Sequence, residues 1–393
     1  MLVLSRAFPN NVFTLLGLWA ARIVAATGDV ADAKVVSPVP WCPPVPGLPA
    51  YYSDYRRVAR HDWSVDAEVF RPRFIAGPGL ALYNVEPAFY YAGVRRTVAR
   101  IRRDFPFDLV HAHFVYPDGV VAARIAREYD VPLVITEHAP WGPWLDESPL
   151  VRRQTVWAAE RSAAHVVPST AVLRSVERYR PADARMRVVP NVVDDSVFTL
   201  ASDDPPRDPR QILFAGAVRH VKGVDVLLQA IRLLADRGCD AHLVVVGEPF
   251  YAAYRREEER LRALALELGL GGSVRFAGPQ QPHELARTMQ TSAVVVLPSR
   301  AESFGVVLAE ALACGTPVVA TRCGGPEDIV DDSVGVLVPP EDPESLADGL
   351  AHVLGSRDGY DARTLSATAL ERYGTAAVGR RYGEIYAEVL GVA

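Results

Sequence analysis

The sequence of 393 residues is poor in cysteine and has no long uninterrupted hydrophobic segment. Its four cysteines are Cys42, Cys239, Cys314 and Cys323. Because none forms a Cys-x-x-Cys pair, a disulfide-rich scaffold and a zinc framework are excluded, and a reducing, cytoplasmic compartment is favoured. The apolar stretch 12–26 is interrupted by Arg22 and is too short to span a bilayer. We expect a strand followed by a core helix here, rather than a signal peptide.

Basic residues are slightly outnumbered by acidic ones. The chain has 42 lysine and arginine residues against 47 aspartate and glutamate residues, which gives a net charge of −5. This balance argues against broad contact with a phosphate backbone, so we expect no nucleic-acid partner. Only two of the basic residues are lysines, Lys34 and Lys222, which makes each of them more informative than an arginine. Hydrophobic residues make up 49% of the chain, enough for a large core, and this excludes disorder as the main state.

Short apolar segments alternate with amphipathic ones from end to end, which predicts an α/β fold with doubly wound parallel sheets covered by helices. We expect strands at 2–5, 33–37, 109–114, 133–137, 165–168, 187–190, 211–215, 242–246, 273–276, 293–297 and 317–320. We expect helices at 118–129, 150–163, 224–236, 251–268 and 304–313. The proline-rich segment 38–49 predicts an extended loop.

The acidic, proline-rich stretch 200–210 has the composition of a linker. It separates a domain at 1–200 from a domain at 201–370. A final helix within 371–393 has no strand after it, and we expect it to cross back to the first domain. Ligands of doubly wound sheets bind beyond the carboxyl ends of the strands, so the cleft between the two domains is the expected site.

Two loops at such strand ends carry chemistry. After the strand at 293–297 come Glu302 and a glycine-containing turn, with Ser303 as the expected N-cap of the next helix and Glu310 inside it. The backbone N–H groups at that helix start suit a phosphate, and a buried carboxylate accepts hydrogen bonds from a diol. After the strand at 211–215 comes a basic loop with Arg219 and Lys222, whose charge suits phosphate oxygens.

These motifs resemble the retaining nucleotide-sugar glycosyltransferases of family four, which have the GT-B fold. The resemblance rests on the E-x7-E spacing of Glu302 and Glu310, on the GTPVVA string that follows and on GGPED. It extends through KGVDVLLQA from Lys222, VVVGE, VRFAGP and AVVVLPSRAESFG. It is weaker in the first half, in FPNN, VHAHFVYPDG, VITEH and VVPNVVDDSVF. FPNN and VVSPVPW are closest to members that build polysaccharides.

The resemblance implies a role for each matching residue. It implies that Glu310 binds the ribose, that Lys222 neutralises the diphosphate, and that His138 lies near the donor sugar. His138, Glu302 and Lys222 are the expected catalytic residues. The remaining expected donor contacts are Gly216, Arg219, Arg275, Phe276, Ser303, Phe304, Gly305 and Val306. The expected acceptor-side residues are Asn10, Asn11, His113 and Trp141. We expect His111 and His113, which alternate on one strand, to face opposite sides, so that at most one of them faces the ligand.

The sequence departs from the family pattern in three places. Ala217 stands where the family has an arginine, and we expect Arg219 to substitute for it. The loop at 8–11 lacks the usual glycine pair, and no glycine follows until Gly17. Val192 stands where a glycine is common.

The expected reaction transfers a hexose from a nucleoside diphosphate to a hydroxyl of a glycan, lipid-linked or natural-product acceptor, with retained anomeric configuration. No Asp-x-Asp tripeptide occurs, so we expect no metal and no cofactor. A nucleotide-sugar epimerase with the same fold and a non-catalytic sugar-nucleotide-binding subunit remain alternatives. Peripheral contact with the inner face of the membrane through the basic segment 95–103 also stays open, and the sequence predicts no oligomeric state.

Overall fold

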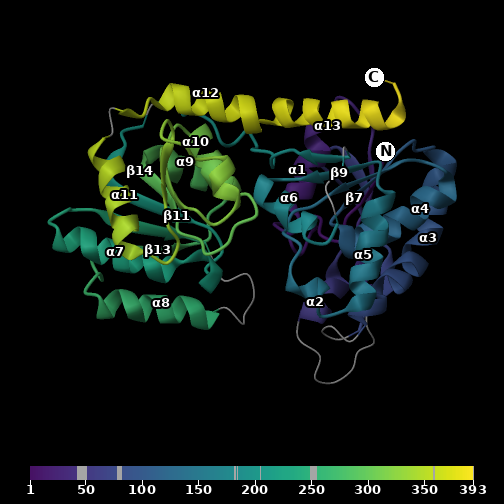
Figure 1. Ribbon diagram of the computed structural model, residues 1–393, viewed down its shortest axis with the longest axis horizontal. Coiled ribbons are helices and arrows are strands. Elements are labelled where there is room, and N and C mark those ends of the chain that lie inside the picture. Colours follow the sequence, from purple (N-terminus) through teal and green to yellow (C-terminus); the bar gives the residue numbers. More distant parts are fainter. Residues whose placement is uncertain are drawn as a thin grey trace. The chain divides into compact units, whose positions relative to one another are not determined.

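The computed structural model describes residues 1–41, 51–77, 82–180, 183, 185–203, 205–247, 255–356 and 359–392. The chain divides into two compact units. The first comprises Met1–Val192 together with Thr375–Ala393, and the second comprises Val193–Gly374. Each unit has a central sheet with helices on both faces, which confirms the predicted α/β class (Figure 1).

The first unit is built on an eight-stranded sheet in which only the edge strand β4 runs antiparallel to its neighbour. In pairing order the strands are β10 (Met186–Val188), β9 (Ala164–Val167), β8 (Leu133–Thr136), β7 (Val110–His113), β1 (Leu2–Leu4), β2 (Lys34–Val36), β5 (Ala67–Phe70) and β4 (His61–Ser64). The chain order reverses between β1 and β7, which is the switch point where such sheets bind ligands. A separate two-stranded sheet joins β3 (Val39–Trp41) and β6 (Arg73–Ile75).

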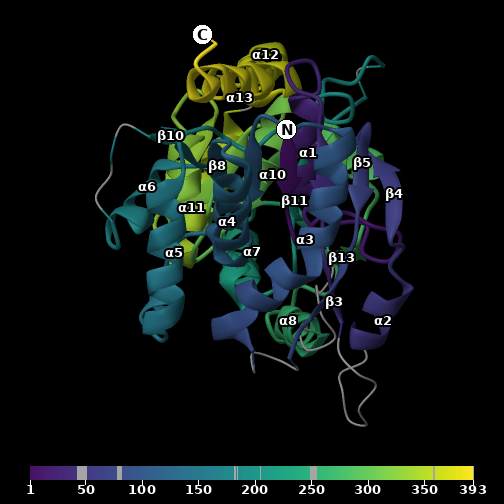
Figure 2. The same ribbon diagram turned by 90° about the vertical axis from the view of Figure 1, so that its right-hand side faces the viewer.

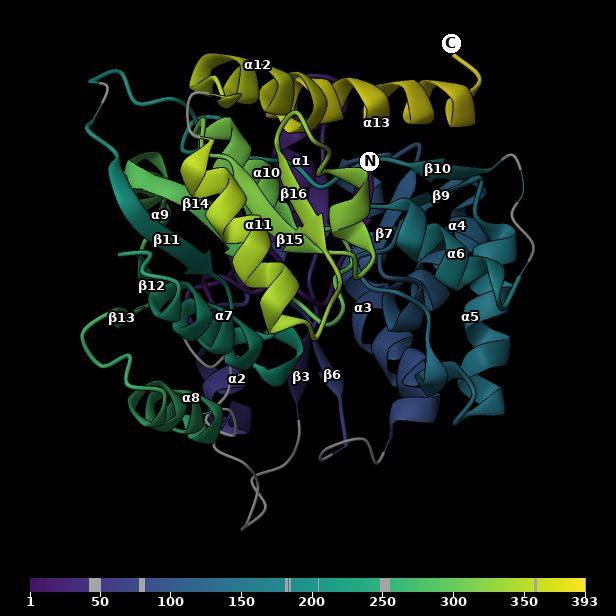
Figure 3. The ribbon, with the colours of Figure 1, turned by 60° about the vertical axis from the view of Figure 1, so that its left-hand side comes forward.

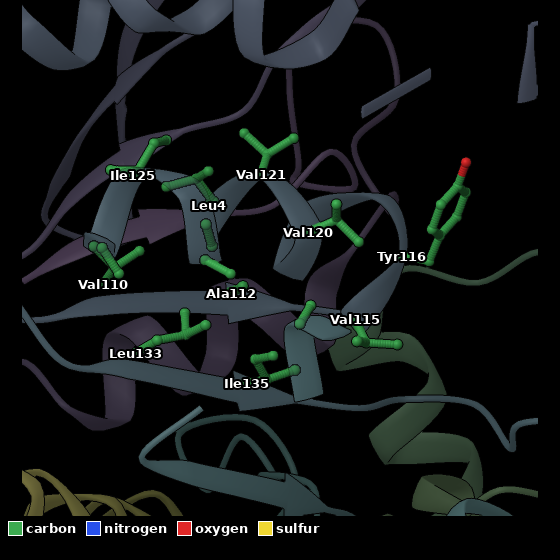
Figure 4. Packing of buried hydrophobic residues seen from close by; sticks show 14 of the residues in the cluster. Leu4, Val110, Ala112, Val115, Tyr116, Val120, Val121, Ile125, Leu133 and Ile135 are labelled. Carbon is green, nitrogen blue, oxygen red and sulfur yellow. The ribbon is translucent and has the colours of Figure 1, made fainter. Parts of the chain in front are cut away.

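Helices cover this sheet because each presents an apolar stripe to it. One face is covered by α3 (Glu86–Asp104), α4 (Val120–Tyr129), α5 (Pro149–Arg161) and α6 (Thr170–Glu177), seen together in Figure 2. The other face is covered by α1 (Leu18–Ala26) and α13 (Thr375–Leu390), and a short helix, α2 (Tyr51–Arg57), lies near β3. In Figure 4, Val121 and Ile125 of α4 pack with Val110 and Ala112 of β7 in one buried cluster.

The second unit has a six-stranded, wholly parallel sheet. Its strands are β13 (Val274–Gly278), β12 (His242–Val246), β11 (Asp208–Ala215), β14 (Ser292–Leu297), β15 (Val318–Thr321) and β16 (Gly335–Val338). The core on one face includes α7 (Val224–Asp236), α8 (Arg255–Glu267) and α11 (Pro343–Gly355); that on the other includes α9 (Pro282–Thr291), α10 (Val306–Ala313) and α12 (Ala362–Tyr373) (Figure 3). The switch point lies between β11 and β14.

The predicted helices and strands match the observed ones best where an apolar segment is bounded by glycine or polar residues. The strand at 242–246 and the helix at 224–236 have the predicted limits. The extended loop at 38–49 was only partly right, because Val39–Trp41 pairs as β3, and residues 42–50 lie outside the described part of the chain. The sequence pattern did not indicate the strands β3, β4, β5, β6 and β16. In the described part of the chain, no helix is both long and apolar enough to cross a membrane.

The C-terminal helix α13 contributes large buried side chains to the first unit, so we predict that it stabilises that unit strongly. Tyr382 is fully buried among residues of α1 and the sheet. Replacing Tyr382 by Ala should lower the free energy of unfolding by about 3–5 kcal/mol, because a large ring is lost from a packed core. Glu384→Ala changes an exposed position of the same helix and should have little effect in the same urea titration. Equal losses in the two variants would contradict this role.

Candidate functional site

In the second unit, the candidate site is built at the carboxyl ends of the two strands that flank the switch point. Lys222 follows β11 and Glu302 follows β14, and the Lys222 ammonium forms an ion pair with the Glu302 carboxylate. Both side chains are largely buried, with 22% and 15% of their surfaces exposed. The hydroxyl of the fully buried Ser299 also donates to Glu302, at 3.4 Å. The structure thus brings together two residues that lie 80 positions apart.

Backbone segments approach one another closely around this pair. The Glu302 carbonyl accepts from the Gly325 N–H at 2.8 Å, and the Glu302 N–H donates to the Cys323 carbonyl at 3.2 Å. A Cβ on Gly325 would lie 2.3 Å from the Cα of Phe304. A Cβ on Gly223, next to Lys222, would lie 2.0 Å from the Pro298 carbonyl oxygen. Only glycine fits at these two contacts, so the loops hold Glu302 and Lys222 in fixed positions.

The helix start beside Glu302 differs from the prediction. Gly305, with φ of 91°, is the N-cap of α10, and no side chain caps the helix. Ser303 is therefore not the N-cap; the left-handed turn at Gly305 takes that position instead. Val306 begins the helix, and its exposed N–H groups remain the feature that suits an anion. The Phe304 side chain is 2% exposed and packs on Tyr373, so its backbone alone is available to a ligand.

The other residues predicted to contact the donor also lie in the second unit, and their side chains range from buried to exposed. Glu310 is 6% exposed within α10. Gly216 follows β11, and its carbonyl oxygen lies against Gly247, where a Cβ would come within 1.9 Å of it. Arg219 and Arg275 are exposed. The ring of Phe276 on β13 is covered on one side by the Arg262 guanidinium, 4.5 Å from the ring centroid. These positions are compatible with the predicted roles but do not test them.

In the first unit, a group of aromatic and imidazole rings surrounds His138 at the end of β8. The His138 Nε2 hydrogen-bonds to Nδ1 of His113, on the neighbouring strand β7, at 3.0 Å. Trp19 of α1 stacks on His138 with ring centroids 3.9 Å apart. Sequence reasoning missed Trp19, although its position on the first helix after β1 could have indicated it. His113 is fully buried, so its contact with His138 makes it a positioning residue.

The expectation that His111 and His113 face different sides was wrong. Side chains two residues apart on a strand point to the same face, and the two rings lie 4.6 Å apart. His111 hydrogen-bonds through Nε2 to the Thr136 hydroxyl at 2.8 Å and through Nδ1 to the Tyr386 hydroxyl of α13 at 2.9 Å. Hydrogen bonds therefore connect Tyr386 of α13 to His111, and the His111 ring packs against His113.

Three predicted acceptor-side residues serve the structure in ways the sequence did not indicate. Trp141 is 2% exposed, and its indole N–H donates to the Glu137 carboxylate at 2.9 Å. Burial leaves no free face for stacking, which corrects the expectation that Trp141 contacts an acceptor. Asn10 accepts from the N–H of Phe13 at 2.9 Å, and Asn11 accepts from the N–H of Ala59 at 2.8 Å. These bonds fix the loop that lacks the family's glycine pair.

Burial sets the protonation of this region. Desolvation lowers the pKa of His111 to about 3 and lowers the pKa values of His113 and His138 well below their usual range, with His111 acting in the same direction on both. All three rings are neutral at pH 7. Nearby, burial raises the pKa of Asp118 to about 7, against the influence of Arg6 and Tyr90. In the described part of the chain, no three His, Cys, Asp or Glu side chains are grouped so as to hold a metal ion.

We predict that the histidines make the first unit acid-sensitive. Their pKa values are lower in the folded state than the unfolded value near 6.5, so their stabilising contribution is present above that pH and lost below it. His111 alone should cost about 1.4 kcal/mol of unfolding free energy per pH unit below 6. Asp118 acts oppositely: its contribution is present below pH 3.8 and lost as pH rises through 7.

The test follows the urea midpoint from pH 8 to pH 5. His111→Gln should show a shallower loss on acidification than the wild type, whereas Asp118→Asn should show a steeper one. Parallel pH profiles for the three proteins would show that neither buried group titrates as described. The slope is compared rather than the absolute stability, because either substitution also changes packing.

The contact between Gly223 and Pro298 gives a second prediction. Gly238, with φ of 78°, shares the left-handed conformation of Gly223, with φ of 66°, but no atom lies within 4 Å of the position that a Cβ would take there. Gly238→Ala should therefore cost about 1–2 kcal/mol, the strain of the backbone alone. Gly223→Ala should cost clearly more, because the Pro298 carbonyl must move. Equal costs in denaturant titrations would mean that the close approach at Gly223 is not rigid.

Two family models match the chain. Residues 199–369 match the model for glycosyl transferases group 1, and residues 58–197 match the model for glycosyltransferase family 4. Among curated relatives, the D-inositol 3-phosphate glycosyltransferase of Acidothermus cellulolyticus is 31% identical over 381 residues, covering 86% of this chain and 83% of that protein. The protein of the same name from Xylanimonas cellulosilytica is 36% identical over 320 residues, covering 75% and 72%.

Solved structures show the same fold across the chain. Sucrose-phosphate synthase from Thermosynechococcus elongatus aligns with a TM-score of 0.79 at 18% identity, covering 100% of this chain and 99% of that one. HepE of Anabaena, in complex with UDP, aligns with a TM-score of 0.75 at 18% identity, covering 98% and 99%. These similarities confirm the GT-B fold, and the sequence relatives confirm that the chain is a transferase. The chain belongs to the GT-B glycosyltransferases of the group 1 and family 4 type.

Proposed function

We propose that this glycosyltransferase moves a hexose from a nucleoside diphosphate to a hydroxyl group, with retained anomeric configuration and without a metal ion. The observation that carries the proposal is the Lys222–Glu302 pair at the switch point of the second unit, beside the uncapped start of α10. A lysine ammonium and free backbone N–H groups are the donors that stabilise a diphosphate leaving group when no divalent cation does so.

The pair also gives Glu302 a role in the reaction. With no donor bound, Lys222 is neutralised by Glu302. A diphosphate that binds Lys222 competes with this carboxylate, which is then free to accept hydrogen bonds from sugar hydroxyls. Gly216, Ser303, Gly305 and Val306 present backbone to the same ligand, and Glu310 would accept from the ribose. Arg219, Arg275 and Phe276 complete the proposed donor set.

His138 acts in this proposal as a neutral group. Because burial lowers its pKa, it offers a hydrogen bond to the transferring sugar without adding charge. His113 holds the His138 ring through the hydrogen bond between its own Nδ1 and Nε2 of His138, and Trp19 supports the ring by stacking. A neutral histidine fits a mechanism in which the departing phosphate oxygen, rather than a protein base, takes the acceptor proton.

The proposal includes several classes of acceptor. The relatives are named for D-inositol 3-phosphate, which makes a phosphorylated cyclitol one candidate acceptor. A growing polysaccharide, a lipid-linked glycan and a natural product are the others, and a cytoplasmic location with peripheral membrane contact belongs to the lipid-linked case. Asn10, Asn11 and His113 stay the proposed acceptor-side residues, acting through the loop and the ring positions that they fix.

The direct test incubates the protein with UDP- and GDP-linked hexoses and a panel of these acceptors, in the presence of EDTA. We expect a product whose anomeric configuration, read by NMR, is that of the donor. An inverted product, or activity only after magnesium or manganese is added, would overturn the proposed mechanism. Conversion of the donor without any acceptor would identify an epimerase, and saturable binding without transfer would identify a non-catalytic subunit.

Lys222 gives the sharpest single-residue test. Lys222→Ala should lower kcat/KM by about 10²–10³, because about 3–4 kcal/mol of transition-state stabilisation on the leaving group is lost. Lys222→Arg keeps the charge and should restore part of the rate. Wild-type kcat/KM in the alanine variant would remove Lys222 from the reaction.

A further inference from the structure

A second concentration of positive charge lies in the first unit, beside the loop at 8–11. A pocket of about 780 Å³ opens where β2, β5 and α3 meet. Its positive lining residues are Lys34, Arg60, Arg71, Arg73 and Arg100, with His61 beside them. Only two carboxylates, Glu68 and Asp104, line the same pocket, although the chain as a whole is acidic. We call this the arginine pocket.

The carboxylates do not satisfy these cations. Glu68 is shared between the Lys34 ammonium at 2.7 Å and the His61 ring at 2.8 Å. Arg71 is 1% exposed and pairs through Nη1 with Asp62 at 2.5 Å. Its Nε has no hydrogen-bond partner among the described residues, and the same holds for Nη1 of Arg73. Arg71 and Arg73 each donate through Nη2 to a backbone carbonyl at 2.6 Å, that of Pro9 and that of Val58. One buried nitrogen in each guanidinium group therefore has no partner among the described residues, which is costly unless another group completes the hydrogen bonding.

The cations also repel one another. Burial lowers the pKa of Arg73, and the charges of Arg60 and Arg71 lower it further. Arg60 and Arg100 lie at the exposed part of the pocket, where they can reach an incoming ligand. Phe70 and Ile101 provide an apolar wall, and the Arg100 guanidinium lies 5.6 Å from the Phe70 ring centroid. The pocket thus combines fixed positive charge with a surface for an organic group.

We propose that the arginine pocket binds a phosphate-bearing ligand. Guanidinium groups match phosphate oxygens in geometry, and a doubly charged anion relieves the mutual repulsion of several cations at once. The volume is sufficient for a phosphate with an attached organic moiety. The pocket lies on a different unit from Lys222, and in the sheet order β1 separates β2, which lines the pocket, from β7, the strand of His113. This proposal does not depend on the proposed transfer reaction.

Pyrophosphate is the first probe, and the Lys222→Ala protein is the background, so that binding at the second unit is suppressed. Calorimetry should show saturable binding that weakens with added salt. Adding Arg60→Gln and Arg100→Gln should weaken it by about tenfold or more, because charge-assisted hydrogen bonds are lost. Arg127→Gln with Arg174→Gln makes the same charge change at exposed positions of α4 and α6 that do not line the pocket, and should leave the affinity unchanged.

A second arm separates the two sources of phosphate. Sedimentation with phosphatidylcholine vesicles, with and without phosphatidic acid, tests a lipid headgroup. Binding to the phosphatidic acid vesicles that is lost in the pocket variant and kept in the control identifies a lipid ligand. Pyrophosphate binding without vesicle binding identifies a soluble ligand. Absence of both, or equal weakening by the two double variants, would overturn the proposal. Arg71 is left intact because its buried ion pair supports the fold.

Discussion

The ion pair between Lys222 and Glu302 is the interaction on which the candidate site of the second unit depends. Partly buried ion pairs contribute little net stability, since desolvation offsets most of the attraction. The close backbone contacts at Gly223 and Gly325 nevertheless fix both partners at adjacent strand ends. This is understandable if the pair serves a ligand: the carboxylate neutralises the ammonium until a diphosphate replaces it. Donor binding then exchanges one anion for another instead of placing a bare charge in a half-buried site.

The candidate site of the first unit is held together differently, because its buried histidine rings carry no charge. A neutral imidazole withdrawn from water still needs partners for its ring nitrogens. His111 finds them in Thr136 and in Tyr386, which comes from the last helix of the chain. The segment after the second unit therefore returns to complete the polar core behind His113 and His138. We infer that α13 acts as a positioning element, whose loss would be felt at His138 without any direct contact to a ligand.

The sequence predicted those helices and strands whose limits are set by neighbouring residues. Helix α7 and strand β12 have sharp apolar patterns with glycine or polar limits, so their bounds could be predicted. The sequence also placed Lys222 and Glu302 at the carboxyl edge of one sheet, because parallel strands share that edge, but the pairing of β11 with β14 came from the structure. It could not show that Gly305 rather than Ser303 caps α10, which depends on a backbone turn. Nor could it show that Trp141 is buried or that Trp19 stacks on His138, since both follow from long-range packing.

Both lysines of this arginine-rich chain share one arrangement. Lys34 pairs with Glu68 and Lys222 pairs with Glu302, and in each pair neither side chain is more than 25% exposed. Each pair lies at a place where we propose that an anion binds, the arginine pocket in one case and the start of α10 in the other. An anion that binds either ammonium competes with an internal carboxylate, so its apparent affinity for that lysine is reduced by the strength of the existing pair. Arginine is poorly suited to such an exchange because its planar fork holds a carboxylate through two hydrogen bonds, whereas a lysine ammonium can turn from one anion to the next.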